Sequence, residues 1–396
     1  MNLFARAATI KLPAASNLEN PRAFQEFFML SSPIKLFLPI LFILFSFTAF
    51  RAQTTPPTDD EPERIFTEEI KLNVTALDLA GKFISGVRKE DLVIMEDGRL
   101  NQASSIRRLP ANVLIVMDMG GEMRQAKSLK QTRQTAKSLI DALQAKDSVA
   151  IMQYSDKAEI IAEWTNDKEL AAKILDTKAN FGRRSVFVNA LETATKFLQK
   201  TPLDNRHLVL ITDGTDSFNN SAERNAAMKN LLATDINVHV VSYTQMELAD
   251  IEPRTKGIST TPPPKAMPDE VKLTMPKGIQ DMMNATRIGP AINTDREFLK
   301  KMRERKTTLI ESEKYLAAVA RDTNGEFVAP ASREEMIDKT ALVARFIDSS
   351  YVVTYAPKRA LKESKPGETR IIEVTSRRPD LDIQAHRKLI VSDSKK

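Results

Sequence analysis

The chain has 396 residues, enough for more than one domain, and its 42% hydrophobic and 28% charged content is typical of globular proteins. The 58 basic and 52 acidic residues give a formal charge of +6 without a dense Lys/Arg block, which argues against nucleic-acid binding. The absence of cysteine excludes disulfides, thiolate metal sites and a cysteine nucleophile, and the three histidines lack a zinc-binding spacing.

Near the N-terminus, residues 34–50 form an apolar stretch that is short for a membrane span of ~20 residues. A lysine precedes the apolar run and the small residues Ala49 and Ala52 follow it, an order typical of a secretory signal peptide. A start at Met29 rather than at the first residue would give a signal of ordinary length. We expect residues 1–52 to be an N-terminal extension with a cleaved signal peptide or a membrane anchor. Either alternative places the bulk of the chain outside the cytoplasm.

Residues 53–63, QTTPPTDDEPE, are polar, acidic and proline-bearing, and predict a linker. Short alternating segments fill residues 64–110, and the run DLVIME followed by Asp97-Gly98 predicts a hairpin. We therefore expect a small, sandwich-like β-module ahead of the next domain.

Two acidic residues follow buried strands. The run VLIVM in residues 113–117 predicts a strand buried on both faces, with Asp118 at its carboxyl end. A second such run, HLVLIT in residues 207–212, ends at Asp213. In open α/β sheets this edge carries the ligand sites. Asp118 and Asp213 are therefore predicted to converge, and a hard, oxygen-bound cation such as Mg²⁺ would suit them.

Strands and helices alternate from residue 111 to residue 347. Helices are predicted over residues 125–145, 167–175, 186–198, 221–234 and 308–321, and strands over 148–154, 207–212 and 236–243. This order predicts an α/β fold, Rossmann-like, with a mostly parallel central sheet and helices on both faces. A proline-containing stretch, residues 246–307, predicts an irregular insertion with a short helix at 295–305. Residues 348–396 predict C-terminal β-strands and a tail.

The segment from residue 112 to about 347 resembles a von Willebrand factor type A (VWFA) domain. The resemblance rests on the strand ending in Asp118, the strand SVAIMQYSD, the segment GRRSVFVNAL, the strand LVLITDG and the segment EKYLAAVARDTNGEFVAPASREEM. The flanking segments DLVIMEDGRLNQASSI and YVVTYAPKR resemble a subgroup of bacterial exported proteins described as VWFA-related.

The resemblance implies a metal-ion-dependent adhesion site built on Asp-x-Ser-x-Ser, a threonine and a third-loop aspartate. Asp118, Ser185 and Asp213 stand at three of these positions and would be metal ligands. Gly120 and Glu122 stand where the family has two serines. Gly120 offers no side-chain oxygen, whereas Glu122 offers a longer, charged one that would serve as a replacement ligand. The implied ion is Mg²⁺, or Mn²⁺ or Ca²⁺, in a site of degenerate type; a vestigial site whose carboxylates only cap loops is the alternative.

The function implied is that of an exported binding and adhesion module. It would bind a protein partner at a bacterial cell envelope through the loops at the carboxyl edge of the sheet, and would be periplasmic, secreted or tethered to the membrane through residues 34–50. The alternative is an assembly scaffold whose β-elements do the binding. The sequence contains no nucleophile elbow, HExxH motif or phosphate-binding loop, so we do not expect an enzyme.

Beside Ser185, Arg183 and Arg184 would bind a carboxylate or phosphate, or form a solvated basic loop.

Overall fold

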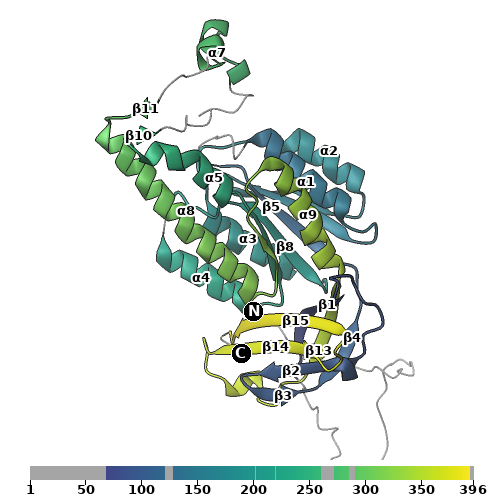
Figure 1. The fold of residues 1–396 in the computed structure, drawn as a ribbon. Coiled ribbons are helices and arrows are strands. Elements are labelled where there is room, and N and C mark those ends of the chain that lie inside the picture. The colour runs from purple at the N-terminus through teal and green to yellow at the C-terminus, as the bar shows by residue number, and fades with distance from the viewer. Residues whose placement is uncertain are drawn as a thin grey trace, which may run out of the picture. The chain divides into compact units, whose positions relative to one another are not determined.

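A computed structural model describes residues 68–120, 128–200, 202–218, 220–259, 272–284 and 290–392 (Figure 1). All of them belong to one of the two compact units into which the chain divides. The predicted N-terminal segment 1–52, the linker 53–63 and Glu122 lie outside the described residues. Among the helices in the described part of the chain, none has the length and apolar character needed to span a membrane.

The centre of the α/β domain is a six-stranded sheet with the strand order β12-β9-β8-β5-β6-β7. Its strands are β5 (Asn112–Asp118), β6 (Ser148–Tyr154), β7 (Ala158–Thr165), β8 (Arg206–Thr212), β9 (Asn237–Ser242) and β12 (Phe327–Val328). All neighbours pair in parallel except β6 and β7. The predicted parallel sheet is therefore confirmed, and β5 and β8 are neighbours in it, so their carboxyl ends meet.

Helices cover both faces of this sheet because alternate residues of β5 point to opposite sides. Val113, Ile115 and Met117 pack with α1 (Leu129–Ala142), α2 (Lys168–Lys178) and α9 (Arg333–Asp348). Leu114 and Val116 pack with α3 (Phe187–Lys200), α4 (Ser221–Leu232) and α8 (Arg296–Asp322). All five strand residues are 0% exposed, so β5 is the buried axis of the domain.

The predicted irregular insertion, residues 246–307, contains more regular structure than expected. It begins within α5 (Thr244–Ile251) and continues through η2 (Glu252–Thr255), β10 (Ile258–Ser259), α7 (Lys277–Asn284) and β11 (Ala291–Ile292). The helices expected at 295–305 and 308–321 are one helix, α8, of 27 residues. Asp295 caps its first turn by accepting the Phe298 N–H, and no glycine or proline interrupts it.

The segments before and after the α/β domain form one antiparallel sheet with the order β3-β2-β14-β15-β1-β13-β4. Its strands are β1 (Ile70–Asp78), β2 (Leu92–Glu96), β3 (Arg99–Asn101), β4 (Ala103–Arg107), β13 (Ser350–Tyr355), β14 (Thr369–Ser376) and β15 (Leu381–Ile390), with the short helices η1 (Lys89–Asp91) and η3 (Leu361–Glu363). Only Gln102 separates the edge strands β3 and β4, so the sheet curls around its apolar core. The hairpin predicted at Asp97-Gly98 joins β2 and β3, and both turn residues have positive φ.

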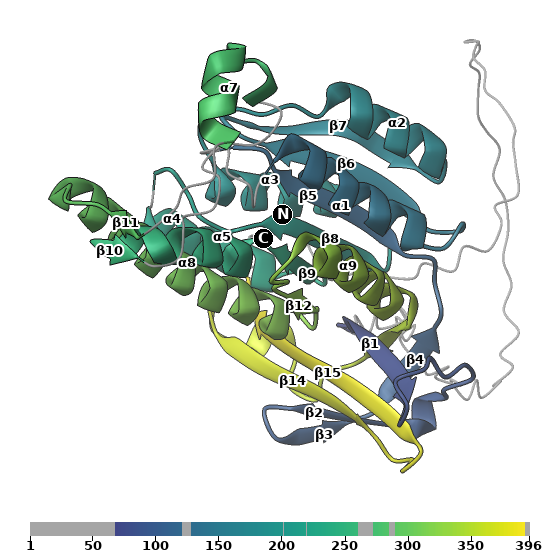
Figure 2. The same ribbon diagram turned by 45° about the horizontal axis from the view of Figure 1, so that its top comes forward.

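Buried polar contacts join this sheet to the α/β domain, where β15 packs against α4 and α8 (Figure 2). Arg387 of β15 is 2% exposed and donates to the carbonyl oxygens of Thr234 and Ile236, just before β9. Asn324, in the loop after α8, donates its side-chain N–H to the Asn73 carbonyl oxygen of β1 at 2.7 Å. These contacts satisfy buried backbone carbonyls that would otherwise be costly.

Candidate functional site

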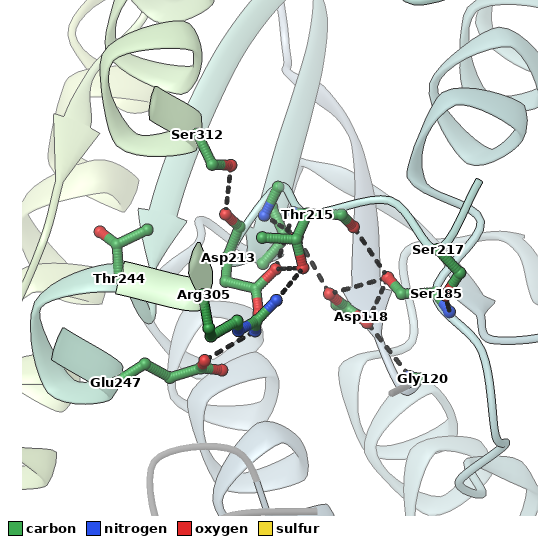
Figure 3. Close-up of polar contacts among 12 residues, drawn as sticks. Asp118, Gly120, Ser185, Asp213, Thr215, Ser217, Thr244, Glu247, Arg305 and Ser312 are labelled. Carbon is green, nitrogen blue, oxygen red and sulfur yellow. Dashed lines mark hydrogen bonds and ion pairs between the residues drawn. The ribbon is translucent and has the colours of Figure 1, made fainter. Parts of the chain in front are cut away.

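Asp118 lies at the carboxyl end of β5 and is 0% exposed (Figure 3). Its carboxylate accepts the Gly120 N–H at 3.1 Å and the Thr212 hydroxyl at 3.2 Å. The Ser185 hydroxyl lies 3.3 and 3.4 Å from the two carboxylate oxygens. The expected approach of Asp118 and Ser185 is thus present. The carboxylate is held by its own loops, as a buried charge requires.

Two hydroxyl groups connect the strands beneath this carboxylate. Tyr154 of β6 lies 2.7 Å from the Thr212 hydroxyl oxygen at the end of β8. Because Thr212 gives its single hydrogen to Asp118, the Tyr154 phenol must donate to Thr212. Burial, together with the charge of Asp118, raises the pKa of Tyr154 well above its ordinary value, so the phenol keeps its proton.

The loop carrying Ser185 is tied to the loop after β8. The Ser185 N–H donates to the Ser217 hydroxyl oxygen, and the Ser217 N–H donates to the Ser185 carbonyl oxygen, both at 2.8 Å. One carboxylate oxygen of Asp216 accepts the Val188 N–H at 2.9 Å in the first turn of α3. The Ser185 hydroxyl also reaches the Thr215 carbonyl oxygen at 3.1 Å. Ser217 and Asp216 therefore order the edge of the site.

Asp213 forms an ion pair with an arginine that the sequence did not suggest. Arg305 of α8 donates through Nη2 to Asp213 Oδ2 at 2.9 Å and to Glu247 Oε2 of α5 at 2.8 Å (Figure 3). Through Nη1 it donates to the Thr215 hydroxyl oxygen at 3.1 Å, and that hydroxyl donates to Asp213 Oδ1 at 2.7 Å. A guanidinium group thus bridges two carboxylates that are each 1% exposed.

The electrostatics of this cluster keep Arg305 charged. Burial alone would lower the pKa of Arg305, but the adjacent Asp213 and Glu247 carboxylates outweigh it and raise the pKa above its ordinary value. Asp213 therefore has a permanent positive partner from its own chain. Helix α8 delivers that charge, so the cluster also fixes α8 against the carboxyl edge of the sheet.

Gly120 is glycine for a steric reason. A Cβ atom built on Gly120 would overlap the carbonyl oxygen of Arg184 and lie 2.6 Å from its carbonyl carbon. The two loops approach so closely that their backbones are in contact. A serine, the residue of the family pattern at this position, does not fit unless the loop of Arg184 moves.

The donor set fits a resident divalent cation poorly. Within the described ranges Asp118 and Ser185 offer oxygens side by side, but Gly120 offers none and Asp213 is turned to Arg305. No group of three or more His, Asp or Glu side chains in the described part of the chain could hold a metal ion. Glu122 lies outside the described residues, so its role as a replacement ligand stays a prediction.

Sequence reasoning missed Arg305, Glu247 and Thr212. Thr212 was the residue before a predicted ligand, and its place at the end of a strand beside β5 was a usable signal. Glu247 and Arg305 lay in a segment expected to be irregular, which hid their positions. Their opposite charges alone do not reveal a pairing across 58 residues of sequence.

Comparisons with known proteins agree with this architecture. The family model described as von Willebrand factor type A domain matches residues 113–215, from β5 to the loop after β8. A search of curated proteins gives no match. The matched range includes Asp118, Ser185 and Asp213, the positions on which the resemblance rested.

Distant similarities to solved structures are also found. An aerotolerance-related membrane protein from Bacteroides fragilis is 16% identical, with a TM-score of 0.37, over 60% of this chain and 98% of that one. BatB from Bacteroides thetaiotaomicron is 17% identical, with a TM-score of 0.35, over 60% and 98%. A von Willebrand factor type A protein from Catenulispora acidiphila is 9% identical, with a TM-score of 0.39, over 83% and 74%. Likenesses this distant carry no argument about function. The family match alone identifies the domain: the chain carries a von Willebrand factor type A domain, matched over residues 113–215.

Proposed function

We propose that this chain is an exported interaction module, not an enzyme, that binds a protein partner at the bacterial cell envelope without a resident metal ion. Von Willebrand factor type A domains are generally interaction modules, and their sites often hold a metal. The binding surface is the set of loops at the carboxyl edge of the parallel sheet. The protein is periplasmic, secreted or tethered through residues 34–50.

The observation that carries the proposal is the pairing of Arg305 with Asp213 and Glu247. A metal-bridged adhesion mechanism needs an exposed cation with open coordination positions for a partner carboxylate. Here the positive charge beside Asp213 is a guanidinium that donates hydrogen bonds to buried groups of the same chain. Binding at this edge is then carried by the surfaces of the loops, which the hydrogen bonds between Ser185 and Ser217 hold in place.

Site-specific photo-crosslinking tests this proposal on the full chain. Benzoylphenylalanine replaces Phe218, which is 62% exposed at the loop edge, or Leu79, which is 81% exposed beside β1 of the antiparallel sheet. Irradiation is carried out in the envelope fraction of the source cells, with and without EDTA. We expect a discrete cross-linked protein from position 218, equally in both conditions, and none from position 79.

The pattern of cross-links separates the alternatives. A product from position 79 alone would replace the proposal by the assembly scaffold, in which the antiparallel sheet does the binding. Loss of the position 218 product in EDTA would restore the metal-dependent mechanism with Mg²⁺, Mn²⁺ or Ca²⁺. Products that differ from one preparation to the next would indicate random encounter and count against a specific binding module.

A further inference from the structure

Two exposed arginines, Arg183 and Arg184, stand beside the buried site in the loop between α2 and α3. Neither forms an ion pair with a carboxylate in the described part of the chain. Some other arginines do have such partners; Arg206, for example, lies 2.7 Å from Asp235. The guanidinium groups of this loop are therefore available to a charge outside the chain.

The backbone of this arginine loop is held in place. The Gly182 N–H donates to the Met119 carbonyl oxygen at 2.9 Å. Ser185 and Ser217 are joined by two hydrogen bonds, one donated by the backbone N–H of each residue, and the Arg184 carbonyl contacts Gly120. A loop that is already ordered loses less conformational entropy when it binds a partner. The two arginines therefore project from a preorganised platform.

Two carboxylates of the same edge accept backbone N–H groups. Asp156 accepts the Arg183 N–H with Oδ2 at 3.2 Å. Asp216 accepts backbone N–H groups with both of its oxygens, those of Val188 and Phe218, at 2.9 and 2.8 Å. Backbone donors therefore use one oxygen of Asp156 and both oxygens of Asp216, whereas neither arginine of the loop has a carboxylate partner in the described part of the chain.

Phe218 adds an apolar and orienting element. Its side chain is 62% exposed, and the guanidinium carbon of Arg184 lies 5.5 Å from the centre of its ring. That distance is within the range of cation–π attraction, which favours a guanidinium plane set over the ring. Arginine and aromatic residues are the side chains that most often dominate binding energy at protein interfaces.

We propose that Arg183, Arg184 and Phe218 form a docking surface for an acidic protein segment, with carboxylates bound by the arginines and an apolar side chain packed on the phenylalanine. This rests on the proposed function and names the chemistry of the partner. Arginine binds carboxylates with paired, charge-assisted hydrogen bonds. A polyanion such as DNA fits less well, because the basic cluster consists of only two arginines.

Fluorescence anisotropy tests the docking surface on the full chain in EDTA. The probe is a labelled synthetic peptide, DEDFEDDE, and its matched control replaces every Asp and Glu by Asn and Gln. We expect saturable binding of the acidic probe that weakens as salt rises. The variant R183A/R184A should lose about tenfold in affinity, since two charge-assisted contacts are removed. F218A should lose affinity for this probe and much less for a probe without its phenylalanine.

The matched variant is K229A/K314A, which removes the same formal charge from exposed positions on α4 and α8. It should stay within about twofold of the wild type. Equal losses in the two double variants would overturn the docking surface, because only net charge would then matter. Equal or tighter binding of a DNA oligonucleotide of the same charge would also overturn it. Either failure leaves the cross-linking result at position 218 unaffected, so failure of the docking surface and failure of the proposed function are distinguishable.

Discussion

At the scale of single residues, Arg305 bridges two buried carboxylates, those of Asp213 and Glu247. Removing one member of a buried ion pair leaves an uncompensated charge. We predict that Arg305→Met lowers the free energy of unfolding by about 3 kcal/mol, because two carboxylates that are 1% exposed lose their partner. Urea denaturation followed by fluorescence of Trp164, the only tryptophan, measures this change.

The same variant tests what Arg305 replaces. Once the guanidinium is gone, millimolar Mg²⁺ or Mn²⁺ should raise the melting temperature of Arg305→Met, because a cation can neutralise the freed carboxylates. The wild type should not respond. The control Arg305→Met with Asp213→Asn and Glu247→Gln should be insensitive to metal. A wild type stabilised as strongly as the variant would contradict the role given to Arg305.

Gly120 makes a second prediction at this scale. Gly120→Ser restores the hydroxyl of the family pattern, but its Cβ would overlap the Arg184 carbonyl oxygen. We expect a loss of about 1–3 kcal/mol in stability and no gain of metal affinity in calorimetry. Gly278→Ser is the control, since a Cβ there meets nothing within 4 Å. An unchanged urea midpoint for Gly120→Ser would show that the two loops separate easily.

How far the sequence predicts the site depends on the residue. The proximity of Asp118 and Ser185 could be predicted because the family pattern and the parallel strands put their loops at one edge of the sheet. Arg305 could not, since its partner Asp213 is 92 residues away and no local pattern links them. The close approach of Gly120 to Arg184 is likewise a backbone contact, visible only in three dimensions.

At the scale of secondary-structure elements, β8, β9 and β12 are linked by a buried pair of histidines. The Glu326 N–H donates to Nδ1 of His239, so Nε2 of that ring carries the hydrogen and donates to Nδ1 of His207 at 3.0 Å. Nε2 of His207 then donates to the Asn205 side-chain oxygen at 2.9 Å. Every ring nitrogen has a partner only when both rings are neutral.

This pair predicts acid sensitivity. Burial lowers the pKa of His239 to about 3 and, with His239 adding to the effect, lowers the pKa of His207 well below its usual range. As pH falls below about 6.5, the unfolded chain takes up protons that the folded chain refuses. The contribution of the neutral histidines to the free energy of unfolding should therefore be complete above this pH. Below it, the free energy of unfolding should fall by about 1.4 kcal/mol per pH unit for each histidine, until the pKa of the folded state is reached.

Urea denaturation between pH 5 and 6.5 checks the acid sensitivity, because most carboxylates stay ionised there. The variant His207→Gln with His239→Gln removes both titrating groups. Its stability should depend on pH less steeply than that of the wild type, whatever its stability at neutral pH. Identical slopes would show that the pair does not govern the response to acid.

The extent of helix α8 shows where sequence patterns no longer predict secondary structure. Strand β5 and the helices on either side were predicted because apolar periodicity reports burial directly. Helix α8 was divided because its N-terminal half, from Arg296 onward, carries many charges and few buried apolar residues. That half is helical because Asp295 caps it and because η2 packs against it through the ion pair of Lys306 with Glu252.

At the scale of the whole described unit, the antiparallel sheet joins segments that the entire α/β domain separates in the sequence. Thr75 of β1 pairs with Ser350 of β13 and with Gln384 of β15, so the first described strand depends on the last ones. Local patterns predicted strands in both segments, but pairing between segments so far apart leaves no local trace. We therefore expect the antiparallel sheet and the central parallel sheet to unfold together only while the contacts between them are intact.

Arg387 is the test of that cooperation, because it is buried at the junction and donates to carbonyl oxygens of the α/β domain. Burial lowers its pKa to about 10, so it stays charged at neutral pH. Arg387→Met should leave the Thr234 and Ile236 carbonyls unpaired and split one unfolding transition into two.

Two probes measure this change. Trp164 fluorescence would follow unfolding of the α/β domain, and far-UV circular dichroism would follow unfolding of both sheets. The exposed Lys362→Met is the control. Coincident transitions in Arg387→Met would show that other contacts suffice to couple the sheets.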